Sequence, residues 1–207
     1  MTVATGAATL STFGLNTSFA IKRWPEPERW AALTRQIGVD LVQFSFDLLD
    51  PWWPATLGGR QAARIRAACT AEGLTLDSAF LGLAAYSYNG LLHPDRDVRD
   101  VTEDWWRRAI DLAAQMGAGA MGGPLGATSV AGRAVPGLRE ETTERMHRLA
   151  EHARSCGLQA LLIELTPLRR EWPHTPDELR ELLWLTAQTA VPWRVVLDLG
   201  HTLVVVH

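Results

Sequence analysis

The chain has 207 residues, of which 47% are hydrophobic and 21% are charged, and its formal net charge is -3. This composition can bury a large core, which excludes a disordered or low-complexity protein. It provides no basic surplus of the kind that usually accompanies binding to nucleic-acid phosphates, so we expect no nucleic-acid partner.

The two cysteines are too few for a disulfide framework, and neither belongs to a Cys-x-x-Cys pair. Cys69 and Cys156 both lie in segments with helical character, where a buried free thiol is the expected state. Residues 1–14 lack the basic segment followed by an apolar segment that a secretory signal peptide has. No apolar run approaches the roughly 18 residues that a membrane span needs. These features predict a cytoplasmic, reducing location and no membrane partner.

Four segments with helical character end at a glycine that is followed, within three residues, by a strand-like run. The glycines are Gly38, Gly73, Gly117 and Gly157. A glycine just past a helix end readily takes the left-handed conformation that turns the chain. Each of the four is therefore predicted to connect a helix to the next strand.

With a helix in each interval, the chain predicts six strands, which begin near residues 12, 41, 75, 118, 159 and 195. Apolar residues at helical spacing mark these helices, for example over residues 105–116 and 146–153. The last helix is predicted to begin at Thr175 as its cap, with Pro176 in the first turn and Glu178 completing a capping box.

Strict alternation of apolar strands with helices predicts an α/β fold, with a parallel sheet covered by helices. The strand starts lie about 37 residues apart, and eight such units would need about 290 residues, the size of a (β/α)₈ barrel. The chain therefore predicts either a complete open sheet of six strands or an incomplete barrel of about six βα units. No linker or shift in composition divides residues 1–207, so we expect a single domain.

In parallel α/β folds, functional residues collect at the carboxyl ends of the strands. Glu164 follows Leu161, Leu162 and Ile163 in the fifth predicted strand, which should be buried on both faces. An unpaired carboxylate there is costly unless it is protonated, paired or bound to a metal. An ion pair with an arginine of a neighbouring strand is the structural alternative to a functional site.

Asp198 has the same context at the end of the sixth predicted strand, and His201 follows three residues later. Two carboxylates on adjacent strand ends suit a hard divalent cation such as Mg²⁺ or Mn²⁺. An imidazole beside them would bind the metal or hold a substrate oxygen. The sequence thus predicts Glu164 and Asp198 as metal ligands, provided that the two carboxylates open into one pocket.

The loops after other strands carry further candidates for substrate contacts. Arg169 and Arg170 match the geometry of a phosphate or carboxylate, although such a pair is equally typical of a solvated loop. Trp52 and Trp53 could form an apolar wall against a sugar face. His93 precedes a predicted helix, where capping is favoured over a contact with substrate.

The other helical histidines are not predicted to be functional. His174 adjoins Thr175 at a helix start and is expected to cap. His147 and His152 lie five residues apart on a helix and do not share a face, so we expect both to be solvated.

Six stretches of the chain together resemble the sugar phosphate isomerase/epimerase family: KRWPEPERW, GVDLVQFSFDLLDPWWP, YNGLLHPD, GGPLGA, LLIEL and VVLDLGH. The fold of that family is the xylose-isomerase-like TIM barrel, which also houses ketose 3-epimerases and DNA-repair enzymes of the endonuclease IV type. The resemblance covers nearly the whole chain. It is greatest to bacterial members that act on short-chain ketose phosphates such as erythrulose phosphate.

The resemblance also implies roles for individual residues. Ketose 3-epimerases of the family hold one divalent metal through a Glu, an Asp, a His and a Glu that follow strands five to eight. Glu164 matches the first ligand and Asp198 the second, while His201 matches a substrate-binding histidine. Glu171 is the nearest match to a further substrate-binding glutamate. The resemblance implies Mn²⁺, Mg²⁺ or Co²⁺ as cofactor, and an ene-diolate reaction of a small ketose or ketose phosphate in which Glu164 is one of two proton-transferring glutamates.

The family's seventh and eighth strands have no counterpart in the chain, so the resemblance implies a C-terminally truncated barrel with open sheet edges. Such a chain is expected to be poorly active alone and prone to form homo-oligomers. One alternative is therefore a non-catalytic fragment. A decarboxylase of a sugar-derived oxo-acid would pass through a similar intermediate. A DNA-repair endonuclease of the same fold is disfavoured, because extra histidine ligands and a basic face are lacking.

Overall fold

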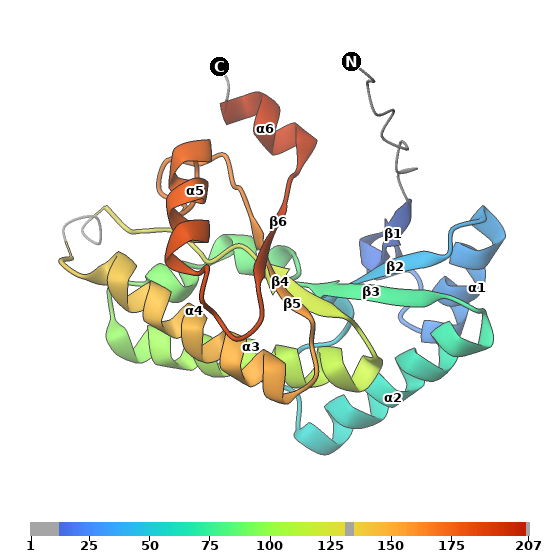
Figure 1. Cartoon of the computed structure of the whole chain (residues 1–207). Helices are drawn as coiled ribbons and strands as arrows, with labels where there is room; N and C mark the ends of the chain where they lie inside the picture. The colour runs from blue at the N-terminus through green and yellow to red at the C-terminus, as the bar shows by residue number, and fades with distance from the viewer. Residues whose placement is uncertain (1–12, 131–134, 206–207) are drawn as a thin grey trace, which may run out of the picture.

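The computed structural model of the protein describes residues 13–130 and 135–205, in which strands and helices alternate along the chain (Figure 1). The strands are β1 (Gly14–Asn16), β2 (Leu41–Ser45), β3 (Thr75–Phe80), β4 (Ala120–Gly123), β5 (Ala160–Glu164) and β6 (Trp193–Val196). The helices are α1 (Pro27–Ile37), α2 (Ala55–Ala71), α3 (Arg96–Met116), α4 (Leu138–Ser155), α5 (Pro176–Leu185) and α6 (Leu199–Val205). Each strand begins within two residues of its predicted start.

The local signals that end and begin the helices act as predicted. All four helix-ending glycines have positive φ, between 66° and 88°. The Thr175 side chain accepts a hydrogen bond from the Glu178 amide at 3.2 Å, which caps α5. The Glu178 carboxylate accepts a hydrogen bond from the amide of His174, the residue before the cap, at 3.0 Å. The predicted capping box would use the amide of Thr175 instead.

The order of the strands decides between the two predicted architectures. All six are parallel, and they lie side by side in sequential order from β1 to β6. A doubly wound open sheet reverses its order at a switch point, whereas strands that follow one another in sequence are typical of a barrel wall. The fold is therefore an incomplete (β/α) barrel with β1 and β6 at the two edges of the sheet (Figure 1).

The core lies between the sheet and the helices, and Figure 1 shows α2, α3 and α4 beneath the strands. Leu161 and Ile163 of β5 are fully buried, as predicted, whereas Leu162 between them is only partly buried. Trp106 of α3 lies against Trp193 of β6 with ring centroids 6.0 Å apart. Ile37, the last residue of α1, lies at helical spacing from the buried Trp30 but is 63% exposed. No helix within residues 13–130 and 135–205 combines the length and the apolar character that a bilayer span requires.

Charged side chains join α3 to α4. The Arg145 guanidinium is 1% exposed and donates to Glu103 at 2.8 Å and to Glu141 at 2.7 Å. Glu141 also accepts from Arg99 at 2.7 Å. Buried charges are tolerated only when they are paired and hydrogen-bonded, so these contacts fix the spacing of the two helices.

Replacing Arg145 by alanine should lower the free energy of unfolding by about 3 kcal/mol, because Glu103 loses a buried partner and a cavity forms. Urea denaturation measures the change. The matched control is Arg180→Ala, which removes an arginine whose side chain is 74% exposed and should cost no more than about 0.5 kcal/mol. Equal losses in the two variants would show that the buried contacts do not stabilise the fold.

The Arg99 guanidinium, together with that of Arg145, lowers the pKa of Glu141 from 4.5 to about 2. A carboxyl whose pKa is depressed on folding contributes stability above its unfolded pKa and loses it as the pH falls toward its folded pKa. We therefore expect Glu141→Gln to reduce the free energy of unfolding by about 1–2 kcal/mol at neutral pH. Denaturation at a series of pH values should show this difference shrinking from pH 4.5 down to about 2. The exposed neighbour Glu140 supplies the control, since Glu140→Gln at neutral pH should change the free energy of unfolding by no more than about 0.5 kcal/mol.

Candidate functional site

Glu164 is the last residue of β5 and is 4% exposed. The Tyr86 hydroxyl, from the 3-10 turn Leu83–Ser87 after β3, donates a hydrogen bond to Glu164 Oε2. His201, from the start of α6, places Nδ1 3.2 Å from Glu164 Oε1. The buried carboxylate is therefore contacted from the loops of two other strands.

The surroundings of Glu164 favour the protonated forms of both its carboxyl and the Tyr86 hydroxyl. Burial raises the pKa of Glu164, as do the charges of Asp198 and Glu171, while the Tyr86 hydrogen bond and His201 act in the opposite direction. Burial and the hydrogen bond to Glu164 raise the pKa of Tyr86 above its usual range, so its hydroxyl stays protonated. Tyr86 is therefore a permanent hydrogen-bond donor to Glu164.

Asp198 lies two residues beyond β6, and its Oδ1 accepts a hydrogen bond from the His201 amide at 3.1 Å. One ligand atom each of Glu164, Asp198 and His201 lies within 4.8 Å of the other two. The structure thus brings together the residues that the strand-end argument places at one edge of the sheet. Their roles stay predictions.

The donor set of this group fits a divalent cation. Two carboxylates and an imidazole suit Mn²⁺, Mg²⁺ or Co²⁺. His201 Nδ1 is buried and makes no hydrogen bond with the described residues, although it faces Glu164 Oε1 at 3.2 Å. A nitrogen and a carboxylate oxygen that face each other in this way are suited to share a cation.

A cavity of about 540 Å³ lies beside the loop that follows β5. Arg169, Arg170 and Glu171 line it, together with Arg139, Trp172 and His174. Glu171 is 9% exposed, and its Oε2 accepts from the Leu168 amide at 3.2 Å, so this carboxylate shapes its own loop. Arg170 and Glu171 thus line the cavity, whereas Glu164 does not.

A second cavity, of about 550 Å³, is formed by the loops after β2, β3 and β4. Its wall is largely apolar and includes the aromatic residues Phe46, Trp52 and Tyr88 of these loops and Trp105 of α3. Of the two predicted tryptophans, Trp52 faces this space and Trp53 does not line it, and the Arg108 guanidinium covers the Trp52 ring at 4.6 Å. The aromatic wall after β2 therefore comes from the first tryptophan of the pair.

His93 lies at the entrance to α3, where its Nδ1 accepts a hydrogen bond from the Asp95 amide at 3.0 Å. The cap of α3 is nevertheless Asp95, whose side chain accepts from the Asp97 amide at 2.9 Å, so the predicted capping role falls to Asp95 and His93 holds the amide of the cap residue. His93 lines neither cavity, so its predicted contact with substrate has no support in this arrangement. His174 also lies at a helix start, with Nδ1 2.6 Å from the Glu178 carboxylate.

Tyr86 is the main site residue that the sequence did not single out as a partner of Glu164. The two are 78 positions apart, and no local spacing connects them. Gln43 is another, because its side chain joins Asn16 at 2.7 Å and Ser78 at 3.2 Å across three strands. A polar residue within the apolar run of β2 was the available signal for Gln43.

Residues 31–206 match the family model described as a xylose isomerase-like TIM barrel. The chain belongs to the xylose isomerase-like TIM barrel family. This confirms the resemblance that the six sequence stretches carry, and it agrees with the sequential order of the strands.

Solved structures and a curated protein of this barrel family are similar to the chain. A protein of Rhodospirillum rubrum ATCC 11170 with the provisional name xylose isomerase is 37% identical, with a TM-score of 0.88 over 93% of this chain and 67% of that one. D-psicose 3-epimerase of Clostridium cellulolyticum H10 is 18% identical, with a TM-score of 0.71 over 94% and 65%. D-erythrulose 1-phosphate 3-epimerase of Brucella abortus (strain 2308) is 26% identical over 92% of this chain. The chain spans 63% of the length of that Brucella protein.

Within this member of the barrel family, we expect Gly126→Ala to lower the free energy of unfolding by at least about 2 kcal/mol. Gly126 has φ of +123°, and a Cβ there would lie 2.0 Å from the Asn89 carbonyl oxygen, so the loop after β4 would be forced away from the loop after β3. Thermal denaturation measures the loss. Gly38→Ala is the control, because Gly38 has φ of +85° but open space around it, and should cost only about 1 kcal/mol. Similar losses would contradict the steric argument.

Proposed function

We propose that the chain carries part of the active site of a divalent-metal-dependent epimerase or isomerase of a small ketose or ketose phosphate. The observation that carries the proposal is the grouping of Glu164, Asp198 and His201, whose ligand atoms lie within 4.8 Å of one another. The names of the Brucella and Clostridium relatives, both ketose 3-epimerases, supply the substrate class.

Glu164 and Asp198 would hold the metal, with His201 beside them. When bound, the metal would polarise the oxygens of the ketose and stabilise negative charge on them. Glu164 is the proposed proton acceptor: it takes the proton from the carbon next to the carbonyl, and the C–H electrons pass into an ene-diolate of the sugar. Tyr86 fixes the orientation of Glu164 through Oε2.

The group contains one glutamate, so proton removal and return through Glu164 occur on one face of the sugar. We therefore propose that the chain exchanges the carbon-bound proton with solvent more readily than it inverts the carbon. Arg170, in the cavity beside the loop after β5, is the proposed contact for a phosphate group, because a guanidinium fork matches phosphate oxygens.

Mn²⁺ binding, followed by the paramagnetic resonance signal of the free ion, tests the ligand assignment. Glu164→Gln and Asp198→Asn should each weaken binding by more than about tenfold, because each removes a charged oxygen ligand. Asp177→Asn on α5, whose side chain is 85% exposed, is the matched control and should bind as the unchanged chain does. Unaltered Mn²⁺ affinity in both site variants would remove the proposed metal site.

Solvent exchange tests the chemistry. In D₂O with Mn²⁺, the chain should introduce deuterium at the carbon next to the carbonyl of D-erythrulose 1-phosphate or D-psicose, as read by proton NMR. Glu164→Gln should slow this exchange by about 10²–10⁴-fold, the range expected for loss of a general base. Absence of deuterium from every ketose and ketose phosphate offered would contradict the proposed reaction.

A further inference from the structure

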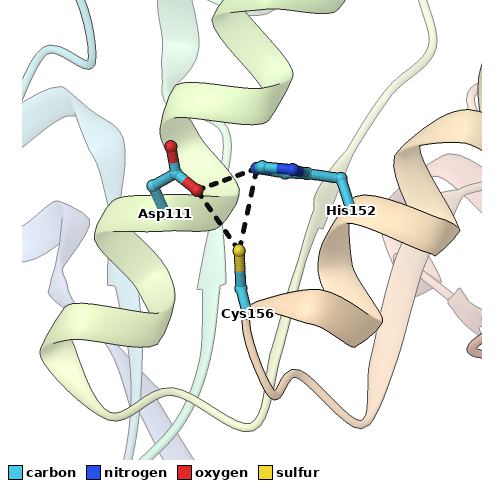
Figure 2. A group of neighbouring side chains, drawn as sticks. All are labelled: Asp111, His152 and Cys156. Atoms are coloured by element: carbon cyan, nitrogen blue, oxygen red, sulfur yellow. Dashed lines mark hydrogen bonds and ion pairs between the residues drawn. The ribbon is translucent and has the colours of Figure 1, made fainter.

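A second group of potential ligands lies on the outer side of the helical layer, between α3 and α4 (Figure 2). Asp111 comes from α3, His152 from the last turn of α4, and Cys156 from the residue that ends this helix. His152 and Cys156 are four positions apart and therefore share a side of the helix. The hydrogen bond from the Cys156 amide to the His152 carbonyl, at 3.0 Å, keeps this last turn intact.

The sequence predicted a solvated His152, which was wrong, and a buried free thiol at Cys156, which is free as predicted but only partly buried. His152 is paired with Asp111 at 2.8 Å, and the Cys156 thiol is only half-buried. The error has one cause, which is that Asp111 lies 41 positions before His152 and meets it only when α3 and α4 pack together.

The three side chains converge through single atoms. His152 Nε2 lies 2.8 Å from Asp111 Oδ1, Cys156 Sγ lies 3.3 Å from the same oxygen, and Sγ lies 3.7 Å from Nε2. Figure 2 shows the corresponding triangle of nitrogen, oxygen and sulfur. One atom of each residue thus lies near an atom of both of the others, close enough for a single ion to contact all three.

This arrangement does not suit a cysteine nucleophile. A Cys–His–Asp relay uses one ring nitrogen for the nucleophile and the other for the carboxylate, whereas here Nε2 serves both. Burial, reinforced by the hydrogen bond to Asp111, raises the pKa of Cys156, which opposes a reactive thiolate. The cluster is a better cation site than a catalytic one.

We propose that Asp111, His152 and Cys156 bind a transition-metal ion, with Zn²⁺ the best match. Thiolate and imidazole ligands select Zn²⁺ over the hard cations that suit the carboxylates near Glu164. Tetrahedral zinc with N, O and S ligands sets these atoms about 3.3–3.6 Å apart, so the observed triangle needs shifts of only about 0.5 Å. Zinc would replace the thiol proton, and water would complete the fourth position.

The metal would join α3 to α4 at the Asp111–His152 end of their interface. The side chains of Asp111 and His152 are 46% and 24% exposed, so an ion can reach them from solvent. This site does not depend on the proposed sugar chemistry, because it shares no residue with Glu164, Asp198 and His201.

Co²⁺ titration of the full chain under reducing conditions tests the proposal. A Co²⁺ ion bound by a thiolate gives a near-ultraviolet charge-transfer band, and the group at Glu164 contains no cysteine and gives none. We expect a stoichiometric band that Zn²⁺ abolishes by displacement. Cys156→Ser should lose the band, whereas Cys69→Ser should keep it, because Cys69 is a 3% exposed core residue of α2.

Ligand variants separate a built site from a thiol that binds metal on its own. His152→Gln and Asp111→Asn should each weaken Co²⁺ binding by more than the ~10–100-fold seen on loss of a ligand's hydrogen-bond partner. Glu164→Gln should leave the band unchanged. Circular dichroism of each variant checks that it is folded. No band in the unchanged chain, a band that survives Cys156→Ser, or full affinity in the His152 and Asp111 variants would overturn the proposal.

Discussion

The candidate site is organised around Glu164, a buried carboxylate at the end of the central strand β5. Glu164 cannot be left without partners there, because an isolated charge in the interior is strongly disfavoured. Its partners come from the loop after β3 and from the start of α6, through Tyr86 and His201. Those contacts are available only because parallel strands in sequential order bring their carboxyl ends to one edge. The strand order that builds the barrel wall therefore also brings the residues of the candidate site together.

In the helical layer, contacts between neighbouring helices differ from contacts between helices and sheet. The helices contact the sheet through apolar side chains, yet α3 and α4 meet through polar pairs along their length. Arg99 pairs with Glu141, Arg145 with Glu103, and His152 with Asp111, over separations of 42, 42 and 41 positions. This nearly constant separation shows that α3 and α4 run parallel, as the helices of successive βα units do, so that residues about one unit apart face each other. The proposed zinc site is the last member of this series.

Family membership and chemistry rest on different observations. The matched family model and the similarity to the Rhodospirillum structure establish the barrel family. Similarity at 18% identity to a ketose 3-epimerase supports the fold alone. The case for metal chemistry comes from the residues of this chain, where an acid and an imidazole at the end of β6 face the acid at the end of β5. The chain spans 63% of its Brucella relative, and the proposed activity is limited to what these residues supply.

Local patterns in the sequence determined the strands and helices, whereas the strand order that makes them a barrel wall is seen only in the tertiary structure. Helical and apolar periodicities, the glycines past the helix ends and the Thr175 cap depend on near neighbours, so they placed every strand start within two residues. The same patterns marked Glu164 and Asp198, because a polar residue after an apolar run is visible in a sequence. Only the tertiary structure decided that Tyr86 contacts Glu164, that Trp52 and not Trp53 lines a cavity, and that His152 meets Asp111. Those outcomes depend on side-chain direction and on packing between segments 41 or more positions apart, which no local spacing encodes.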